Sequence, residues 1–499
     1  MSARPPARVA VREITTRPAW SELRATIHRS RGAWLLDGAS ADADLGRWSF
    51  AGAAPLGVAR SFGDRIDIEP WRRDAPFARR SFRGDPFALL REIVPRAAND
   101  ACSVPFAGGA VGWLGYESAA HVERLRLRRA GGLGTPDAAW LLVDRGLAFD
   151  HAERRLFATA LGADALTAER AVEALAARVV RGGPDLFTDE PATAPMPAAS
   201  GDDTIHEPLT LRDAATGLEL GAFFDADSYA KAVTQIRDEI LAGEVYQANL
   251  THRLTARFGG DARRLFEVLS AKSPAPFAAY LALPEITVVG SSPECFLRLA
   301  SDGRVESRPI KGTRPRGATA ADDARLRAEL AGSEKERAEN AMIVDLVRND
   351  LGRVCVPGSI EVPALFAIEP HATLFQMVST VRGRLRPGLD AVDLLRAVFP
   401  PGSMTGAPKI AAIDLLARLE PVPRGIYAGA LGWIDARGGA GLSVVIRTLL
   451  CRGRRAWLHV GGGIVLDSDP RAEWEETLAK ARAPLDALAA MQDVRGADE

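Results

Sequence analysis

One lysine stands among three arginines in a stretch where it could act as a nucleophile. The stretch runs Arg308-Pro-Ile-Lys-Gly-Thr-Arg-Pro-Arg-Gly317, with Lys311 between Arg308 and the pair Arg314 and Arg316. Like charges nearby disfavour the ammonium form of a lysine and favour the free amine, which attacks electrophiles. The same positive charge would attract an anionic substrate. The alternative is a solvated basic loop, which is what most basic runs are.

A carboxyl group is expected to face this lysine across a β-hairpin. Asp302-Gly303 favours a two-residue type I′ turn between strands at Cys295–Leu299 and Val305–Ile310. Pairing about that turn sets Glu294 opposite Lys311, with Cβ atoms about 5 Å apart unless a bulge shifts the strands. An acid–nucleophile pair and a structural ion pair are both consistent with this spacing.

Two predicted helices each carry a pair of glutamates spaced three residues apart. The first helix follows the N-cap Ser333, and the second follows Asp469-Pro470, where proline suits the first helical turn. In the first helix Glu339 lies on the apolar stripe, where an unpaired carboxylate is costly. Oxygen-only ligands favour Mg²⁺ over zinc. The two helices therefore predict a magnesium site formed by Glu336, Glu339, Glu473 and Glu476.

A structural explanation of the same glutamates stays open. Carboxylates in the first turn of a helix stabilise its macrodipole. That explanation suits Glu336 and Glu473 as well as metal binding does. Glu339 and Glu476 are better explained as ligands of the ion, so these two are the preferred metal-binding residues.

A further group of residues could bind an anionic substrate. The segment Pro401–Lys409 precedes a predicted helix whose first N–H groups, together with Lys409, offer a site for a carboxylate or phosphate. Arg447 ends a predicted apolar strand. Gly461–Gly463 follows another predicted strand, and its bare backbone lets a ligand approach closely. Tyr427 could close the same pocket, although a place in the core is its simpler explanation.

Several other elements must position these groups. Helices are predicted at Ala163–Val180 and Tyr229–Leu241, and strands at Ala33–Leu36 and Trp48–Ala51. The glycine-rich segment Pro105–Tyr116 lacks the spacing of a phosphate-binding or dinucleotide-binding loop and is interpreted as close backbone packing. Three polar residues before a predicted strand could contact the substrate or only bond the strand edge: Tyr246, Gln247 and Asn249.

Composition excludes several classes of function. The chain has 499 residues, is 47% hydrophobic and 25% charged, and carries a net charge of −1, so no global charge favours nucleic acid or a membrane surface. It shows neither a signal peptide nor an apolar run of 18 residues, so no membrane span is expected. The four cysteines lie far apart and form no CxxC pair. These features predict a cytoplasmic protein with reduced thiols and no zinc knuckle.

The chain divides at a segment rich in glycine, proline and alanine. We expect an N-terminal region at 1–185, a linker at 186–220 and a catalytic domain at 221–490. Nearly all the residues with chemical potential belong to the last of these three.

That second part resembles the chorismate-utilising enzymes. The resembling motifs are Pro309-Ile-Lys-Gly-Thr313, Arg337-Ala-Glu-Asn340 with Asp345–Asp350, Pro401–Lys409, Tyr427-Ala-Gly429 and Gly461–Asp469. In the first half, Trp34-Leu-Leu-Asp37, Trp48–Gly52 and Pro105–Gly109 resemble the N-terminal region of the same family. The resemblance implies an α/β fold of the anthranilate synthase type, equally described as α+β, with two packed β-sheets surrounded by helices.

Within the family, the lysine at position 311 makes the chain resemble the aminodeoxychorismate synthases, component I, because anthranilate synthases usually have alanine at this position. This likeness implies that chorismate and ammonia give 4-amino-4-deoxychorismate for para-aminobenzoate and folate biosynthesis. By resemblance, Lys311 adds to C2 of chorismate while Glu294 protonates the departing 4-hydroxyl, and ammonia then attacks C4 and expels the lysine. Mg²⁺ on Glu339 and Glu476 would hold the ring carboxylate. The implied substrate contacts are Thr405, Gly406, Lys409, Tyr427, Arg447, Gly461, Gly462, Gly463 and Gln376.

Two positions depart from the family pattern. Many relatives have histidine where this chain has Gln376, so a proton-transfer role is not expected there, although a hydrogen bond to substrate is. Relatives that bind tryptophan often have serine where Gly38 stands, so tryptophan binding is not expected.

The nitrogen source is expected to be a separate glutamine amidotransferase subunit. A glutaminase needs a cysteine on a glycine-flanked turn, and none of the four cysteines has that setting. Two alternatives stay open: anthranilate synthase component I or another chorismate enzyme, and a non-catalytic regulatory subunit that only binds chorismate. Lys311 argues against the first, and the intact set of Lys311, Glu294, Glu339 and Glu476 argues against the second.

Overall fold

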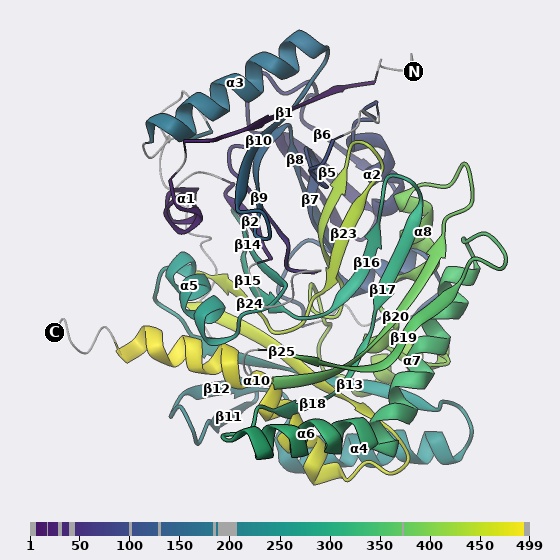
Figure 1. Cartoon of the computed structure of the whole chain (residues 1–499). Coiled ribbons are helices and arrows are strands. Elements are labelled where there is room, and N and C mark those ends of the chain that lie inside the picture. The colour runs from purple at the N-terminus through teal and green to yellow at the C-terminus, as the bar shows by residue number, and fades with distance from the viewer. Residues whose placement is uncertain are drawn as a thin grey trace.

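Two large antiparallel sheets form the frame of the molecule (Figure 1). The computed structural model describes residues 6–16, 18–27, 32–38, 45–98, 102–127, 131–182, 186–187, 207–371 and 374–493. A hydrophobic cluster between the sheets joins Trp34 and Phe50 of one sheet to Val111 and Trp113 of the other. The predicted fold of two packed sheets with surrounding helices is therefore confirmed.

Strands of the first sheet come from the whole length of the chain. In spatial order they are β1 (Arg8–Glu13), β10 (Arg155–Gly162), β9 (Arg145–Asp150), β3 (Trp48–Gly52), β2 (Trp34–Asp37), β14 (Phe277–Ala282), β15 (Thr287–Ser292), β24 (Thr448–Arg452), β25 (Arg455–Ile464), β13 (Gln247–Arg257), β12 (Glu219–Ala222) and β11 (Leu209–Arg212). The short strand β21 (Gly406–Ala407) pairs with β13.

The second sheet is built in the same mixed way. Its order is β18 (Ile310–Pro315), β20 (Leu374–Arg384), β17 (Arg304–Arg308), β16 (Cys295–Leu299), β23 (Ala440–Val444), β22 (Ala430–Asp435), β7 (Gly109–Leu114), β8 (Ala138–Val143), β4 (Gly57–Phe62), β5 (Arg65–Pro70) and β6 (Arg80–Arg83). Strand β19 (Glu361–Pro370) pairs with β20.

Helices lie around this frame (Figure 1). They are α1 (Trp20–Ile27), α2 (Pro86–Ile93), α3 (Ala165–Arg181), α4 (Ala226–Leu241), α5 (Ala262–Lys272), α6 (Ala320–Gly332), α7 (Glu334–Gly352), α8 (Ala391–Val398), α9 (Lys409–Leu419) and α10 (Pro470–Asp493). Two short 3₁₀ helices, η1 (Tyr116–His121) and η2 (Gly402–Met404), complete them. Within the described residues no helix is long and apolar enough to span a membrane.

The predicted boundary between the N-terminal region and the catalytic domain does not separate the two sheets. Each sheet contains strands from before residue 185 and from after residue 221. Residues 188–206 of the predicted linker lie outside the described part of the chain. The end of that linker forms β11 and the start of β12, a hairpin that extends the first sheet through β13.

Local capping signals explain why the two glutamate-bearing helices begin where they do. The hydroxyl of Ser333 accepts a hydrogen bond from the Glu336 backbone N–H and starts α7. The carboxylate of Asp469 accepts from the N–H groups of Arg471 and Ala472 and starts α10 at Pro470. Both predicted helices are thus confirmed, as are α3 and α4 within a few residues.

The hairpin before Lys311 forms, but its predicted register is wrong. The Gly303 N–H donates to the Ala300 carbonyl, and Gly303 has a φ of +84°, so the loop has three residues instead of two. Leu299 therefore pairs with Val305, one residue out of the predicted register. A further irregularity sets Cys295 opposite Arg308, so Glu294 is not the cross-strand partner of Lys311.

Two glycine-rich segments lie inside strands. Gly112 in β7 packs directly on the backbone of Ala139 in β8, as the interpretation of close backbone packing predicts. The segment Gly461–Gly463 was expected to follow a strand, but it lies within β25 and pairs with residues 249–251 of β13. The strand continues because β13 supplies the paired backbone groups along its whole length.

Candidate active site

Lys311 lies on β18 and meets a glutamate of α7. Its Nζ is 3.5 Å from Oε2 of Glu339, and the two side chains are only 11% and 9% exposed. The lysine is therefore not a solvated surface group. The structure brings together the predicted nucleophile and one of the preferred metal ligands from two elements that pack on each other.

The three arginines of the same stretch do not surround Lys311 as free charges. Arg308 pairs with Glu369, Arg316 pairs with Asp323 at 2.7 Å, and Arg314 pairs with Glu329 at 2.9 Å. The expected positive charge around Lys311 is therefore balanced by these carboxylates, and activation of the lysine by like charges stays a prediction. Each guanidinium is paired with a carboxylate on another helix or strand. Such partners cannot be identified from the residues that flank Lys311.

Gly463 leaves room for the end of the lysine side chain. A Cβ added at Gly463 would lie 2.7 Å from Nζ of Lys311 and 2.5 Å from Nε2 of Gln247. Gln247 is 1% exposed, and neither of its amide heteroatoms has a hydrogen-bond partner among the described residues. A buried amide without partners is costly, so this pair fits a ligand that supplies polar atoms above Gly463.

Glu294 is buried beside the same lysine, although the strand register differs from the expected one. Burial raises the pKa of Glu294 to about 7, while the hydroxyl of Ser403 and the charge of Lys311 act to lower it. The Ile310 N–H also hydrogen-bonds this carboxyl group. A carboxyl group that titrates near neutral pH can hold a proton and donate it, as a general acid must.

The four predicted metal ligands lie near one another, with lysines between them. Lys335 is 3.7 Å from Glu473, and Lys480 is 2.7 Å from Glu476. Glu473 is buried and accepts a hydrogen bond from Ser468 at 2.7 Å. Among the described residues, no three carboxylate, imidazole or thiol side chains converge closely enough to bind a single ion in this conformation. The negative charge is met by ammonium groups instead.

The acidic cluster nevertheless fits a divalent cation in charge and in donor type. Burial, and then the charge of Glu339, raise the pKa of Glu336, while Arg314 opposes the shift. Burial also raises the pKa of Glu473, with Ser468 opposing and Glu476 adding to the rise. Carboxylates that disfavour one another's ionisation gain from a shared cation, and their hard oxygen atoms suit Mg²⁺.

Lys409 has a structural role instead of the predicted anion-binding one. Its Nζ donates to Asp350 Oδ2 at 2.7 Å, to the Val398 carbonyl at 2.8 Å and to the Pro400 carbonyl at 3.0 Å. An ammonium group has three N–H donors, so no donor is left for a substrate. The lysine fixes the start of α9 against the end of α7. The prediction missed this because Asp350 is distant in sequence.

Arg447 is a cation without a counter-ion. It sits between β23 and β24 with a φ of +48°, and within the described residues it forms no ion pair. Burial lowers its pKa, and no acidic neighbour acts against that effect. Since a partly buried guanidinium is costly to leave unpaired, this residue is suited to bind an anion such as a substrate carboxylate.

The other predicted substrate contacts lie on three adjoining segments. Thr405 is fully buried, and Gly406 has a φ of +144° where β21 meets β13. Tyr427 is buried and stacks on His459 with ring centroids 5.3 Å apart. On β25, Gly461 accepts a hydrogen bond from Lys480 at 3.0 Å, and a Cβ at Gly462 would lie 3.0 Å from Glu473.

Of the polar candidates outside this group, two are buried and one is not. Gln376 is 2% exposed, and its Oε1 has no hydrogen-bond partner in the described structure. Asn249 is buried with an unpartnered Nδ2. Tyr246 is 66% exposed and is not placed in the core of the site.

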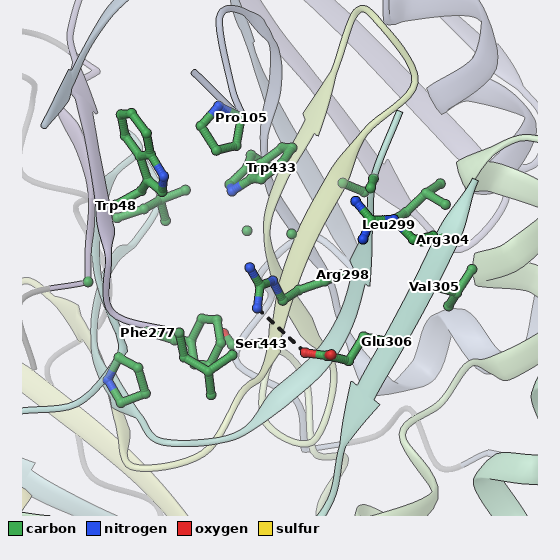
Figure 2. Close-up of a pocket in the computed structure, with 18 of the residues that line it drawn as sticks. Trp48, Pro105, Phe277, Arg298, Leu299, Arg304, Val305, Glu306, Trp433 and Ser443 are labelled. Carbon is green, nitrogen blue, oxygen red and sulfur yellow. Dashed lines mark hydrogen bonds and ion pairs between the residues drawn. The ribbon is translucent and has the colours of Figure 1, made fainter. Parts of the chain in front are cut away.

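A cavity lies elsewhere, between the two sheets. It has a volume of about 760 Å³, and Trp48, Phe277 and Trp433 face it together with the Arg298–Glu306 ion pair (Figure 2). Gly38 is on its wall, whereas none of the predicted catalytic, substrate-binding or metal-binding residues lines it.

Three polar residues of the site were not predicted from the sequence. Ser403 hydrogen-bonds Glu294, and Lys335 and Lys480 compensate the glutamates. Lys480 follows Glu476 by four residues on α10, a spacing that favours an ion pair and could have indicated it. Ser403 gave no comparable signal, because its partner comes from a distant strand end.

The sequence and the structure of the chain are similar to those of known proteins. Residues 71–486 match the model of the chorismate binding enzymes. An aminodeoxychorismate synthase of Streptomyces pristinaespiralis is 41% identical over 488 residues, which cover 96% of this chain and 65% of that protein. The chain thus spans just under two thirds of that relative's length.

Anthranilate synthases are also similar. Component 1 from Streptomyces coelicolor is 36% identical over 466 residues, covering 91% of this chain and 83% of that protein. The crystal structure of anthranilate synthase component I from Streptococcus pneumoniae superposes with a TM-score of 0.71 at 28% identity, covering 88% of this chain and 92% of the other.

Proposed function

The chain belongs to the chorismate binding enzymes, and on that basis we propose that it aminates chorismate to 4-amino-4-deoxychorismate. It is a chorismate-utilising enzyme, and the observation that carries the finer proposal is that Glu294 is buried close enough to Lys311 for the charge of the lysine to act on its carboxyl group. Lys311 is a buried primary amine, and Glu294 beside it has a pKa raised to about 7 by burial. A nucleophile and a protonated acid side by side suit a displacement in which a hydroxyl leaves.

In the proposed reaction, Lys311 attacks C2 of chorismate, and both ring double bonds shift as the C4–O bond breaks. Glu294 gives its proton to the departing oxygen, which leaves as water. Ammonia then attacks C4, both double bonds shift back, and the C2–N bond to the lysine breaks. Glu294 regains a proton from the ammonium group that forms on C4. Nucleophile and acid each act once per cycle, and neither is consumed.

Substrate binding would rest on groups that have no partner among the described residues. Arg447 would pair with a carboxylate of chorismate, and the amide of Gln247 and Oε1 of Gln376 would hydrogen-bond its polar atoms. Thr405, Gly406, Tyr427 and the backbone of Gly461–Gly463 would contact the ring and side chain. Glu339 and Glu476, with Glu336 and Glu473, would hold Mg²⁺. When bound, the ion would neutralise the ring carboxylate.

Ammonia is proposed to come from a separate glutamine amidotransferase. Cys295, Cys355 and Cys451 are buried, and burial raises the pKa of each of these thiols. Buried thiols of raised pKa are inert as nucleophiles, so they do not suit a glutaminase.

Anthranilate synthase activity is the second candidate, since a relative at 36% identity carries that name. The test incubates the purified chain with chorismate, Mg²⁺ and ammonium and identifies the product by mass spectrometry. We expect 4-amino-4-deoxychorismate, and we expect Lys311→Ala to abolish it. Anthranilate as the sole product, or an unchanged rate in the variant, would refute the proposal.

A further inference from the structure

The side chain of Arg424 is fully buried, and the proposed reaction does not use it. Its side chain is 1% exposed and pairs with Glu420 through Nε at 2.9 Å and Nη2 at 2.6 Å. It therefore cannot meet a solvated substrate directly. Its other two contacts, described next, lead to the segments that can.

The guanidinium joins two backbone carbonyls from different segments. Nη1 donates to the Met404 carbonyl at 2.6 Å, directly before Thr405 and Gly406. Nη2 donates to the Asn249 carbonyl at 2.7 Å on β13, at the position paired with Gly463. The planar fork of arginine can hold both carbonyls and a carboxylate at fixed angles, which a lysine cannot.

Glu420 extends the same network along β13. Its Oε1 accepts from the backbone N–H of Thr251 at 3.0 Å and from the Thr251 hydroxyl at 2.9 Å. Thr251 is the residue of β13 that pairs with Gly461. The ion pair thus anchors β13 opposite both ends of the segment Gly461–Gly463.

The first half of the chain holds Arg424 from the other side. Oε1 of Glu117 accepts from the Arg424 N–H and Oε2 from the Gly425 N–H, both at 2.9 Å. The guanidinium carbon lies 4.3 Å from the centroid of the Tyr116 ring. Tyr427 follows three residues after Arg424, so η1 fixes the segment that carries it.

We propose that Arg424 is a positioning residue that holds Thr405, Tyr427 and Gly461–Gly463 at the spacing that chorismate requires. The inference rests on the proposed substrate contacts, but not on which product forms. Lys311 and Glu294 lie on or next to strands of the other sheet and have no bond to Arg424. Loss of the network is therefore expected to weaken substrate binding more than it slows the chemical step.

A matched control exists in the same protein. The Arg437 side chain is only 6% exposed, pairs with Asp435 at 2.7 Å, and donates to the Val104 and Pro105 carbonyls at 2.8 and 3.1 Å. It thus makes the same kinds of contact as Arg424, but none of its partners is a proposed substrate contact. Arg437→Lys removes a comparable network away from the site.

The experiment measures chorismate affinity and turnover separately. Dissociation constants are obtained by calorimetry in a Lys311→Ala background, where no covalent step can follow, and kcat and KM are obtained with Lys311 present. For Arg424→Lys we expect the dissociation constant and KM to rise at least tenfold and kcat to fall less than threefold. For Arg437→Lys we expect both constants within twofold of the parent, with a similar loss of melting temperature.

Each outcome decides the proposal. An Arg424→Lys protein that loses thermal stability like the control but binds chorismate normally would overturn it. If that variant does not fold, Glu420→Gln takes its place, since it removes the ionic partner but keeps both arginine–carbonyl bonds. We expect it to weaken chorismate binding at least threefold, and unchanged binding would overturn the proposal. A parent that binds chorismate yet yields anthranilate would refute the proposed product but leave this inference standing.

Discussion

At the scale of single residues, Lys311 has an acidic neighbour, whereas the arginines beside it in sequence are paired elsewhere. Three arginines flank it in sequence, yet each is paired with a carboxylate of its own, and the nearest charged group to Lys311 is Glu339. Sequence proximity therefore overstated the unbalanced positive charge around Lys311. What sets the site apart is that an acid of raised pKa and a primary amine share a buried space.

The first residue-scale prediction concerns Glu294 and pH. Because burial raises its pKa to about 7, the carboxyl group is protonated below that pH and loses its proton above it. A general acid must be protonated, so kcat/KM should fall as the pH rises through about 7. Glu294→Gln should lower kcat by about 10² to 10⁴-fold and abolish this basic limb in steady-state assays.

Its control is Glu306→Gln, which removes a carboxylate paired with Arg298 and Arg382 outside the site. That variant should keep the wild-type pH profile. A basic limb that persists unchanged in Glu294→Gln would show that another group is the acid.

The second residue-scale prediction concerns the space above Gly463. Gly463→Ala would set a methyl group 2.7 Å from Lys311 Nζ and 2.5 Å from Gln247 Nε2, so both side chains must move. A displacement of about 1 Å at a reacting group can cost about 10²-fold in rate, and we expect at least that loss of kcat. Gly332→Ala is the control, because nothing lies within 4 Å of its added Cβ. Equal activity of the two variants would contradict the placement of Lys311.

At the scale of elements, two helix starts decide where the acids lie. Ser333 and Asp469 cap α7 and α10, and these caps fix which faces carry Glu336, Glu339, Glu473 and Glu476. The caps are local hydrogen bonds between neighbours in sequence, so both helices could be predicted. The magnesium proposal belongs to this pair of helices and not to any one side chain.

We expect Mg²⁺ to stabilise the protein by bridging the two helices. An ion that binds only the native state at 100 times its dissociation constant adds about 2.7 kcal/mol to the free energy of unfolding. Thermal unfolding should therefore shift upward with Mg²⁺, and the shift should shrink in Glu476→Gln. Glu475→Gln, a change at the exposed neighbouring glutamate, should keep the full shift. A shift equal in both variants would remove Glu476 from the site.

Elements whose position depends on distant partners were predicted less well. The Asp302-Gly303 hairpin was foreseen, but one additional loop residue moved the register, because the same dipeptide suits a two-residue or a three-residue turn. The strand β25 runs through Gly461–Gly463 only because β13 pairs with it. Lys409 was mistaken for an anion ligand because its acceptors lie on α7 and near α8. Local chemistry fixes helix starts, whereas strand ends and ion pairs depend on tertiary contacts.

At the scale of the whole molecule, the two halves of the chain form one structure. Both sheets combine strands from before and after the predicted linker, and the hydrophobic cluster between the sheets contains residues of both halves. Neither half can bury its strand edges alone. The composition of the linker could be recognised in the sequence. The sequence did not show that strands from before and after the linker would share each sheet.

This interleaving predicts how the chain responds to being cut. A protein expressed as two fragments, 1–195 and 196–499, should assemble into an active complex, whereas each fragment alone should aggregate or remain unfolded. The intact chain should unfold in a single calorimetric transition, since no sheet belongs to one half. Two separate transitions, or a soluble and folded C-terminal fragment, would contradict the interleaved architecture.

The cavity walled by Trp48, Phe277 and Trp433 bears on inhibitor discovery (Figure 2). Flat aromatic fragments gain more by burial between three aromatic rings than in the polar surroundings of Lys311. Fragment libraries ranked by thermal shift will therefore be enriched in compounds that do not contact Lys311. Hits therefore need a competition assay against chorismate before any medicinal chemistry begins.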